Sequence, residues 1–280
     1  MCSTLKIDKD SRSKLGKVYA VGVGPGSPKY VTEIVREIVQ NCDIIIGYKY
    51  TLKTIEDLIE GKEIYEITMN DQEKSYQKIH PELGDRTLVI PFTGDVNFSE
   101  SEVVDRLIEI FGEIEIIPGI SSIQVAASRA QVPLDKSKVI TMHVTTPIED
   151  KKLELQKALI DGFSVILVPR PWPKQPDRHF MPSEIAFYLK DNNFDTTKMK
   201  VHVFEAITTE NETSFVGIVK DLEGREFSDL SVMVFNQTSL DSYMNYRWQW
   251  ENKLPKFCPS PNIKLSLKFE KTYPSILIQG

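Results

Sequence analysis

The chain has 280 residues, 41% of them apolar and 26% charged, which is enough apolar material for one large folded domain or two smaller ones and excludes a disordered or collagen-like chain. Its formal net charge is −6, whereas nucleic-acid-binding proteins usually carry a basic excess, so no nucleic-acid partner is expected. The three cysteines form no CxxC pair and the four histidines are scattered, so no metal site is predicted. Cys42, which follows a helical pattern, is expected to be a buried and inert thiol.

Changes in composition along the chain predict four segments. Residues 1–16 form a polar, flexible N-terminal segment that lacks the apolar core of a signal peptide. An N-terminal α/β domain (17–132), a second α/β domain (133–237) and a C-terminal extension (238–280) follow. No stretch reaches the roughly 18 uncharged apolar residues of a membrane span, so we expect a cytoplasmic protein with no membrane partner.

In the first domain, short apolar runs alternate with stretches of helical spacing. Strands are expected at residues 17–22, 43–47, 63–67, 87–91 and 114–117. Helices are expected at 31–39, 50–60, 102–111 and from 122 to 129, with a helix or long loop at 70–80. This alternation predicts a mostly parallel sheet covered by helices on both faces.

The second domain has a more mixed pattern. Strands are expected at residues 138–143, 163–168, 199–205, 213–219 and 230–236, and helices at 149–161 and 183–190. Ser183 is expected to cap the second of these helices. The late strands favour antiparallel pairing. In the extension, alternation at 263–269 predicts one edge strand.

Three glycine-bearing loops follow strands of the first domain, at residues 22–26, 93–99 and 118–122. The first is not a dinucleotide fingerprint, because Ser27 stands where the third glycine belongs and Pro25 lacks an amide N–H. Each loop alone could be a tight turn or a helix cap. At successive strand ends of a parallel sheet, the three loops are expected to meet at one edge and form a ligand site.

In this order the loops resemble those of the tetrapyrrole methylase family, the S-adenosylmethionine-dependent enzymes of corrin and sirohaem synthesis. That family has a VGxGPG turn, a GDP-type loop and a PGxSS-type turn, which correspond here to residues 21–26, 94–95 and 118–122. Residues 116–124, and Glu205 followed by 210–212, are similar to the branch that methylates C5 of the corrin ring. The resemblance runs from about residue 17 to 236.

The resemblance implies a two-domain α/β fold, with a mostly parallel sheet in the N-terminal domain, a mixed sheet in the second and a cleft between them. It also implies a homodimer and S-adenosylmethionine as methyl donor. The cofactor-binding residues that it implies are Pro25, Gly26, Gly94, Asp95, Phe98, Ser121, Ser122, Val168, Ala206 and Ile207.

Two departures from the family pattern concern the loops. Val96 stands where the family has a proline, and the His-Gly-Arg of the C5 branch is reduced to His143. Arg170 and Arg178, in a proline-rich loop at 169–182, are therefore expected to bind the carboxylates of the macrocycle together with His143. No catalytic residue is assigned, and the candidate proton acceptors are Glu205, Glu210 and His143.

The expected function is C5 methylation of a corrin-ring precursor, of the cobalt-precorrin-6B or precorrin-6 type, in cobalamin biosynthesis. A separate decarboxylating C15-methyltransferase is a candidate partner, because the domain of that kind sometimes fused to this branch is not recognisable here. Two alternatives stay open. One is another methylase of the same fold with a protein substrate, such as a diphthamide-forming enzyme. The other is a non-catalytic descendant that binds a tetrapyrrole or an adenosyl ligand.

Overall fold

The computed structural model describes residues 16–98, 100–172 and 179–237. The chain divides into two compact units. The N-terminal unit runs through Val125 and also includes the loop Ala206–Glu212, whereas the second unit contains Ala126–Glu205 and the chain from Thr213 onward. The expected edge strand at 263–269 lies outside the described residues. Within the described ranges no helix is both long enough and apolar enough to span a membrane.

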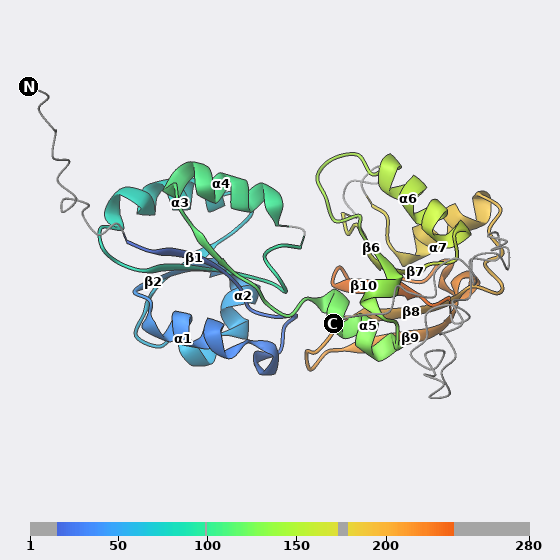
Figure 1. Ribbon diagram of the computed structural model, residues 1–280, viewed down its shortest axis with the longest axis horizontal. Coiled ribbons are helices and arrows are strands. Elements are labelled where there is room, and N and C mark those ends of the chain that lie inside the picture. The colour runs from blue at the N-terminus through green and yellow to red at the C-terminus, as the bar shows by residue number, and fades with distance from the viewer. Residues whose placement is uncertain (1–15, 99, 173–178, 238–280) are drawn as a thin grey trace, which may run out of the picture. The chain divides into compact units, whose positions relative to one another are not determined.

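The N-terminal unit is built on a five-stranded parallel sheet in the order β3-β2-β4-β1-β5. Its strands are β1 (Val18–Gly22), β2 (Ile44–Tyr48), β3 (Glu63–Ile67), β4 (Leu88–Phe92) and β5 (Glu115–Ile117). One face is covered by α1 (Glu33–Asn41) and α2 (Lys49–Thr54), and the other by α3 (Gln72–Ile79) and α4 (Ser101–Phe111) (Figure 1). The predicted parallel sheet with helices on both faces is confirmed.

The position of each strand follows from its side chains. β4 is buried along its whole length, as expected for a central strand that packs against helices on both faces. β3 exposes most of its residues and lies at an edge. The segment at 70–80 is a helix, α3. The helix predicted over 50–60 is interrupted at Ile55, which leaves the helical conformation and is fully buried among the residues of α1 and α2 before a 3₁₀ turn at Glu56–Leu58.

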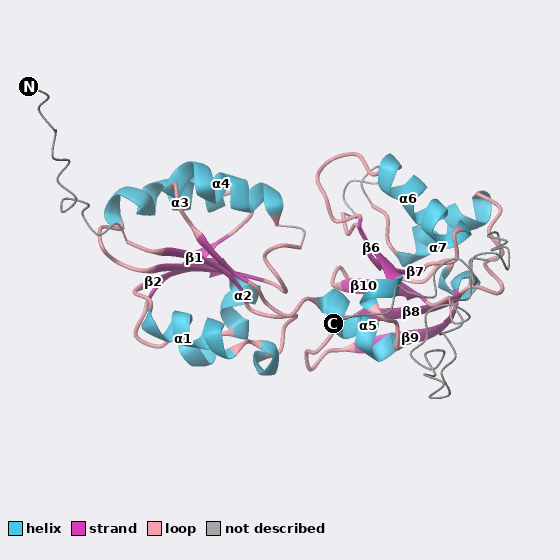
Figure 2. Ribbon diagram, in the orientation of Figure 1, coloured by secondary structure: helices cyan, strands magenta, loops and turns pink. Residues whose placement is uncertain are grey.

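The second unit has a mixed sheet in the order β6-β7-β10-β8-β9. Its strands are β6 (Ser137–Thr141), β7 (Ser164–Val168), β8 (Lys200–Glu205), β9 (Thr213–Ile218) and β10 (Ser231–Phe235). Only β6 and β7 pair in parallel, and the other pairs are antiparallel, as the sequence predicts. The helices are α5 (Ser122–Ala130), which begins in the N-terminal unit, α6 (Glu149–Ile160) and α7 (Pro182–Asp191) (Figure 2).

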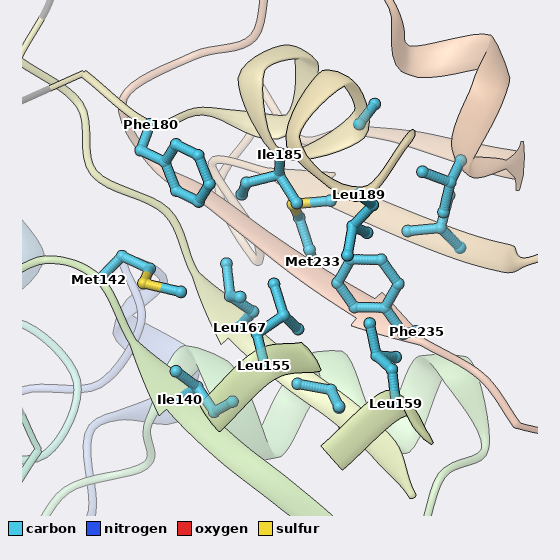
Figure 3. Close-up of a cluster of buried hydrophobic side chains, with 14 of the residues drawn as sticks. Ile140, Met142, Leu155, Leu159, Leu167, Phe180, Ile185, Leu189, Met233 and Phe235 are labelled. Carbon is cyan, nitrogen blue, oxygen red and sulfur yellow. The ribbon is translucent and has the colours of Figure 1, made fainter. Parts of the chain in front are cut away.

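The core of the second unit lies between the sheet and the helices α6 and α7. Leu155 and Leu159 of α6 and Ile185 of α7 pack with Met233 and Phe235 of β10 (Figure 3). Short 3₁₀ helices complete the two units at Pro28–Tyr30, His80–Glu82, Leu134–Lys136 and Val219–Leu222.

The predicted cap of α7 is wrong. Met181 occupies the N-cap position and Pro182 the first helical position, where its fixed φ suits the helix. The Glu184 carboxylate accepts the Met181 N–H at 3.1 Å. Ser183 lies inside the first turn, where its hydroxyl accepts the N–H of Gly224 at 2.8 Å. The helix therefore begins at Pro182, one residue before the predicted start, and the Ser183 hydroxyl makes a tertiary contact instead of a cap.

The prediction for Cys42 is confirmed. Its thiol is buried and free, and it donates to the Val39 carbonyl oxygen at 3.1 Å. Burial raises the pKa of Cys42 to about 11, so the reactive thiolate is scarce at neutral pH.

Candidate functional site

The three glycine-bearing loops meet at the carboxyl ends of three neighbouring strands. β4, β1 and β5 are adjacent in the sheet, and each is followed by one of the loops. The first and second loops are joined by two backbone hydrogen bonds, from Gly24 N–H to Gly94 O at 3.2 Å and from Gly94 N–H to Gly24 O at 2.8 Å. The loops therefore form one surface of main chain.

The close approach of the loops depends on glycines. A Cβ atom on Gly119 would lie 2.2 Å from the carbonyl oxygen of Gly94 and 2.4 Å from that of Gly22. A Cβ on Gly22 would in turn lie 2.6 Å from the Gly119 nitrogen. Gly94 differs, because its φ of +72° requires the left-handed region but a Cβ there would meet nothing closer than 3.6 Å. Gly22 and Gly119 thus permit backbone contact, and Gly94 permits the turn.

Asp95 ties the second loop to the third. One carboxylate oxygen accepts the Asn97 N–H at 2.7 Å within its own loop. The other accepts the Gly119 N–H at 2.9 Å across to the third loop. This hydrogen bond and the glycine contact together hold the third loop against the second.

The third loop runs directly into α5. The Ser121 side chain is buried, and its hydroxyl accepts the Ile123 N–H at 3.4 Å, as an N-cap residue does. The Gln124 side chain returns the contact by accepting the Ser121 N–H at 2.7 Å. Ser122 is the first residue of α5. Ser121 therefore caps α5, and Ser122 belongs to the helix itself.

The loop Ala206–Glu212 brings a fourth segment to this surface. Ala206 and Thr208 have positive φ values of 44° and 72°. The Thr208 hydroxyl oxygen accepts the Ser27 N–H at 3.1 Å, next to the first glycine loop, and Thr208 N–H donates to the Glu212 carboxylate at 2.6 Å. Ile207 is buried within this loop.

The N-terminal unit thus brings together nine of the ten residues that the resemblance assigns to the cofactor. Pro25 is buried, and Gly26 and Phe98 are half-buried. The others in this unit are Gly94, Asp95, Ser121, Ser122, Ala206 and Ile207. The tenth, Val168, is the last residue of β7 in the second unit and is half-buried.

The groups that the four loop segments present suit a cationic cofactor better than a phosphate-bearing one. None of the four loop segments, residues 21–27, 93–99, 118–122 and 206–212, contains a lysine or arginine. A phosphate cradle would need such cations, or amide groups like the one Pro25 lacks. Main-chain groups, hydroxyls and carboxylates fit the sulfonium, amino and ribose groups of S-adenosylmethionine.

In the second unit, the predicted substrate residues lie at the carboxyl ends of β6 and β7. Arg170 is only 2% exposed, and its Nη2 donates to the carbonyl oxygens of Thr145 and Thr146 at 3.2 and 3.1 Å. Its guanidinium carbon lies 4.8 Å from the centre of the Trp172 ring, and the His143 ring meets Trp172 edge to face with centres 5.4 Å apart. Arg178 lies outside the described residues.

The candidate proton acceptors differ in their surroundings. The Glu205 carboxylate accepts from the Thr213 hydroxyl at 2.8 Å and from the Ser228 N–H at 2.5 Å. Glu210 is exposed on the loop Ala206–Glu212. Desolvation lowers the pKa of His143 below its ordinary value, and nearby Arg170 adds to that effect against the opposing charge of Asp229. The His143 imidazole is therefore neutral at pH 7 and able to accept a proton.

Glu100 is an ionisable group that the sequence analysis did not single out. It precedes α4, close to the second loop, and desolvation raises the pKa of its carboxyl group to about 7. Burial raises the pKa values of two nearby phenols, Tyr48 of β2 and Tyr76 of α3, and the charge of Glu100 adds to this effect while Arg106 opposes it. The Tyr76 hydroxyl is buried without a hydrogen-bond partner among the described residues. No local sequence pattern marks this residue, because its surroundings come from three separate elements.

We expect the stability of the protein to fall as the pH rises from about 4.5 to about 7, in part because Glu100 keeps its proton in the folded state over that range. Glu100→Gln should therefore raise the free energy of unfolding at pH 8 by about 1–2 kcal/mol and change it little at pH 4.5. Urea unfolding at both pH values measures this difference. Glu109→Gln, on an exposed position of the same helix, is the control. An effect of Glu100→Gln that is equal at both pH values would contradict the assignment.

Comparison with known proteins gives a consistent result. The model of the family described as Tetrapyrrole (Corrin/Porphyrin) Methylases matches residues 17–223. A probable cobalt-precorrin-7 C(5)-methyltransferase of Methanocaldococcus jannaschii is 29% identical over 222 residues, which cover 78% of this chain and 97% of that protein.

Two solved structures share the fold. The methyltransferase CobJ superposes with a TM-score of 0.63 at 19% identity, over 79% of this chain and 94% of that one. The precorrin-6Y methylase of Archaeoglobus fulgidus superposes with a TM-score of 0.57 at 21% identity, over 80% of this chain and 99% of that one. The predicted two-domain α/β architecture is thereby confirmed.

Proposed function

Because the chain belongs to the tetrapyrrole (corrin/porphyrin) methylase family, we propose that it methylates C5 of a corrin-ring precursor in cobalamin biosynthesis. It is a methyltransferase that uses S-adenosylmethionine as methyl donor. The choice of C5 is supported by the similarity to the probable cobalt-precorrin-7 C(5)-methyltransferase, which extends over almost the whole of that protein. The observation that carries the proposal is the joining of the three glycine loops into one main-chain surface, all within the matched residues 17–223.

The bound cofactor supplies a methyl group that its sulfonium already activates. The protein therefore needs to orient two reactants rather than to generate a strong nucleophile. Main-chain groups of the loops are suited to this task, because the glycine contacts and Asp95 fix their positions. In this proposal the cofactor contacts residues of the N-terminal unit, namely Pro25, Gly26, Gly94, Phe98, Ser121, Ser122, Ala206 and Ile207, with Asp95 alongside them. The role of Val168, in the second unit, stays a prediction of the family resemblance.

The substrate side of the proposal rests on the second unit. The macrocycle carries carboxylates, and Arg178 is proposed to bind one of them. His143 is the preferred proton acceptor, since its imidazole is neutral at pH 7 while the Glu205 carboxylate already accepts two hydrogen bonds. Arg170 is buried, so its contribution to substrate binding would act through Trp172.

The deciding experiment is incubation of the purified chain with S-adenosylmethionine and cobalt-precorrin-6B. Mass spectrometry should show the gain of one methyl group, and NMR should place it at C5. Methylation at another carbon would refute C5 and leave the family activity intact. Cofactor binding without any methylation would favour a non-catalytic, ligand-binding descendant. Methylation of a protein substrate instead would favour the diphthamide-type alternative.

We also propose a cytoplasmic homodimer, as the family resemblance implies. Ile34 of α1 is 52% exposed beside the buried Val35, so this helix presents apolar surface outside the unit's own core. Light scattering at micromolar concentration should give twice the chain mass of 32.0 kDa. A particle of the single-chain mass would refute the dimer.

A further inference from the structure

Trp172 lies at the carboxyl ends of the two parallel strands of the second unit, and the side chains of Arg170 and His143 contact its ring. The Arg170 guanidinium lies against the ring face at 4.8 Å, and the His143 ring meets it at an interplanar angle of 87°. Each is a favourable contact with an aromatic ring, a cation–π contact and an edge-to-face contact respectively. Trp172 is nevertheless only half-buried, so part of a large apolar side chain faces outward.

The base of the loop that carries Trp172 is rigid. Arg170 and Phe180 exchange two backbone hydrogen bonds, at 3.0 and 2.9 Å, which close the loop. Pro169 and Pro171 flank Arg170 and fix their own φ angles. The Arg170 side chain also reaches the carbonyl oxygens of Thr145 and Thr146 in the loop after β6. Arg170 therefore joins two strand-end loops beneath the tryptophan.

We propose that Trp172 is the surface on which the flat face of the macrocycle packs, and that Arg170 is the positioning residue that holds it there. The inference rests on the proposed function and adds a substrate-specificity residue to it. A wide, mostly apolar ring system gains most from an aromatic surface that is already ordered, because little side-chain entropy is lost on binding. The His143 ring contacts the Trp172 ring and can meet a polar group at the macrocycle rim.

The test compares steady-state kinetics with cobalt-precorrin-6B, the Kd for S-adenosylmethionine from calorimetry, and the melting temperature. Trp172→Leu should raise the KM for the macrocycle about tenfold, with kcat and the cofactor Kd nearly unchanged. Trp172→Phe should recover much of the loss, because it restores an aromatic ring. Arg170→Lys should also raise KM, since lysine lacks the planar guanidinium group that lies against the Trp172 ring.

The chain provides a matched control at the opposite end of β7. Lys138 Nζ lies 5.0 Å from the centre of the Phe163 ring, immediately before that strand begins. Phe163→Leu removes a comparable cation–π contact in the same unit, and it should leave the KM for the macrocycle unchanged.

Three outcomes would overturn the inference. The first is a folded Trp172→Leu variant whose KM for the macrocycle is unchanged. The second is an equal rise in that KM for Phe163→Leu. The third is a Trp172→Leu variant whose Kd for S-adenosylmethionine rises while the macrocycle KM does not, which would indicate that the ring contacts adenine instead. Failure of the proposed function is distinguished by the wild-type chain. If the wild type does not methylate the macrocycle, titration of the wild type and of Trp172→Leu with cobalt-precorrin-6B still measures the affinity of each for the macrocycle. Equal affinity of wild type and Trp172→Leu, or no binding by either, then overturns the inference.

Discussion

Gly119→Ala should weaken S-adenosylmethionine binding by about a hundredfold, equivalent to about 2.7 kcal/mol. The new Cβ would lie 2.2 Å from the Gly94 carbonyl oxygen and 2.4 Å from the Gly22 carbonyl oxygen, so the third loop would have to move away from the other two. Overpacking of this kind also costs stability, by about 1–3 kcal/mol. Calorimetric titration and urea unfolding of the same preparation measure the two effects.

The matched control for this variant lies at the other end of β1. A Cβ on Gly16 would lie 2.1 Å from the Arg86 carbonyl oxygen, a clash of similar severity far along the strand from the loops. Gly16→Ala should lose stability and keep its affinity for the cofactor. Normal affinity in folded Gly119→Ala would contradict the placement of the cofactor.

A second variant covers the case in which Gly119→Ala does not fold. In Gly94→Leu, the new Cβ would lie no closer than 3.6 Å to any backbone atom. The substitution therefore costs only the strain of a positive φ, about 1–2 kcal/mol. Its side chain would extend over the loop surface. We expect a folded protein that no longer binds S-adenosylmethionine, and unchanged binding would refute the site.

Asp95→Ala should lower cofactor affinity about thirtyfold and the free energy of unfolding by about 2 kcal/mol. The substitution removes the acceptor of both the Asn97 and the Gly119 N–H groups. Asp95 is half-buried, so water replaces part of the loss and the cost stays below that of two fully buried charged hydrogen bonds. Asp95→Asn, which keeps one acceptor oxygen, should lie between the wild type and the alanine variant.

Asp43 offers a control for the same kind of contact. Its carboxylate accepts the Thr87 N–H at 2.8 Å at the amino end of the same sheet. Asp43→Ala should therefore cost stability without changing the Kd for S-adenosylmethionine. If the two aspartate variants lose cofactor affinity equally, the effect of Asp95 would be one of general stability and not of loop position.

The order of the elements could be predicted from the sequence because it depends on local signals. Apolar runs of strand length, helical spacing between them and glycines directly after strands predicted a parallel sheet with its ligand site at three strand ends. The same local reasoning placed the buried Cys42 correctly. It placed the cap of α7 at Ser183, two positions beyond the observed cap Met181, because Pro182 fixes the backbone of the first helical position.

The roles of individual side chains were decided by the tertiary structure. Asp95 and Arg170 were expected to contact ligands, yet their hydrogen bonds connect separate loops, which no spacing along the chain reveals. Glu100 has an ordinary sequence context, and its raised pKa arises from burial near side chains of β2 and α3.

The sequence by itself therefore determined which segments form the sheet and which strand ends carry the glycine loops, since these depend on residues close in the chain. Only the tertiary structure decided that Gly22 and Gly119 serve backbone contact while Gly94 serves a turn. The physical reason is that a steric contact depends on the distance between loops that are far apart in sequence, whereas a positive φ depends on one residue alone.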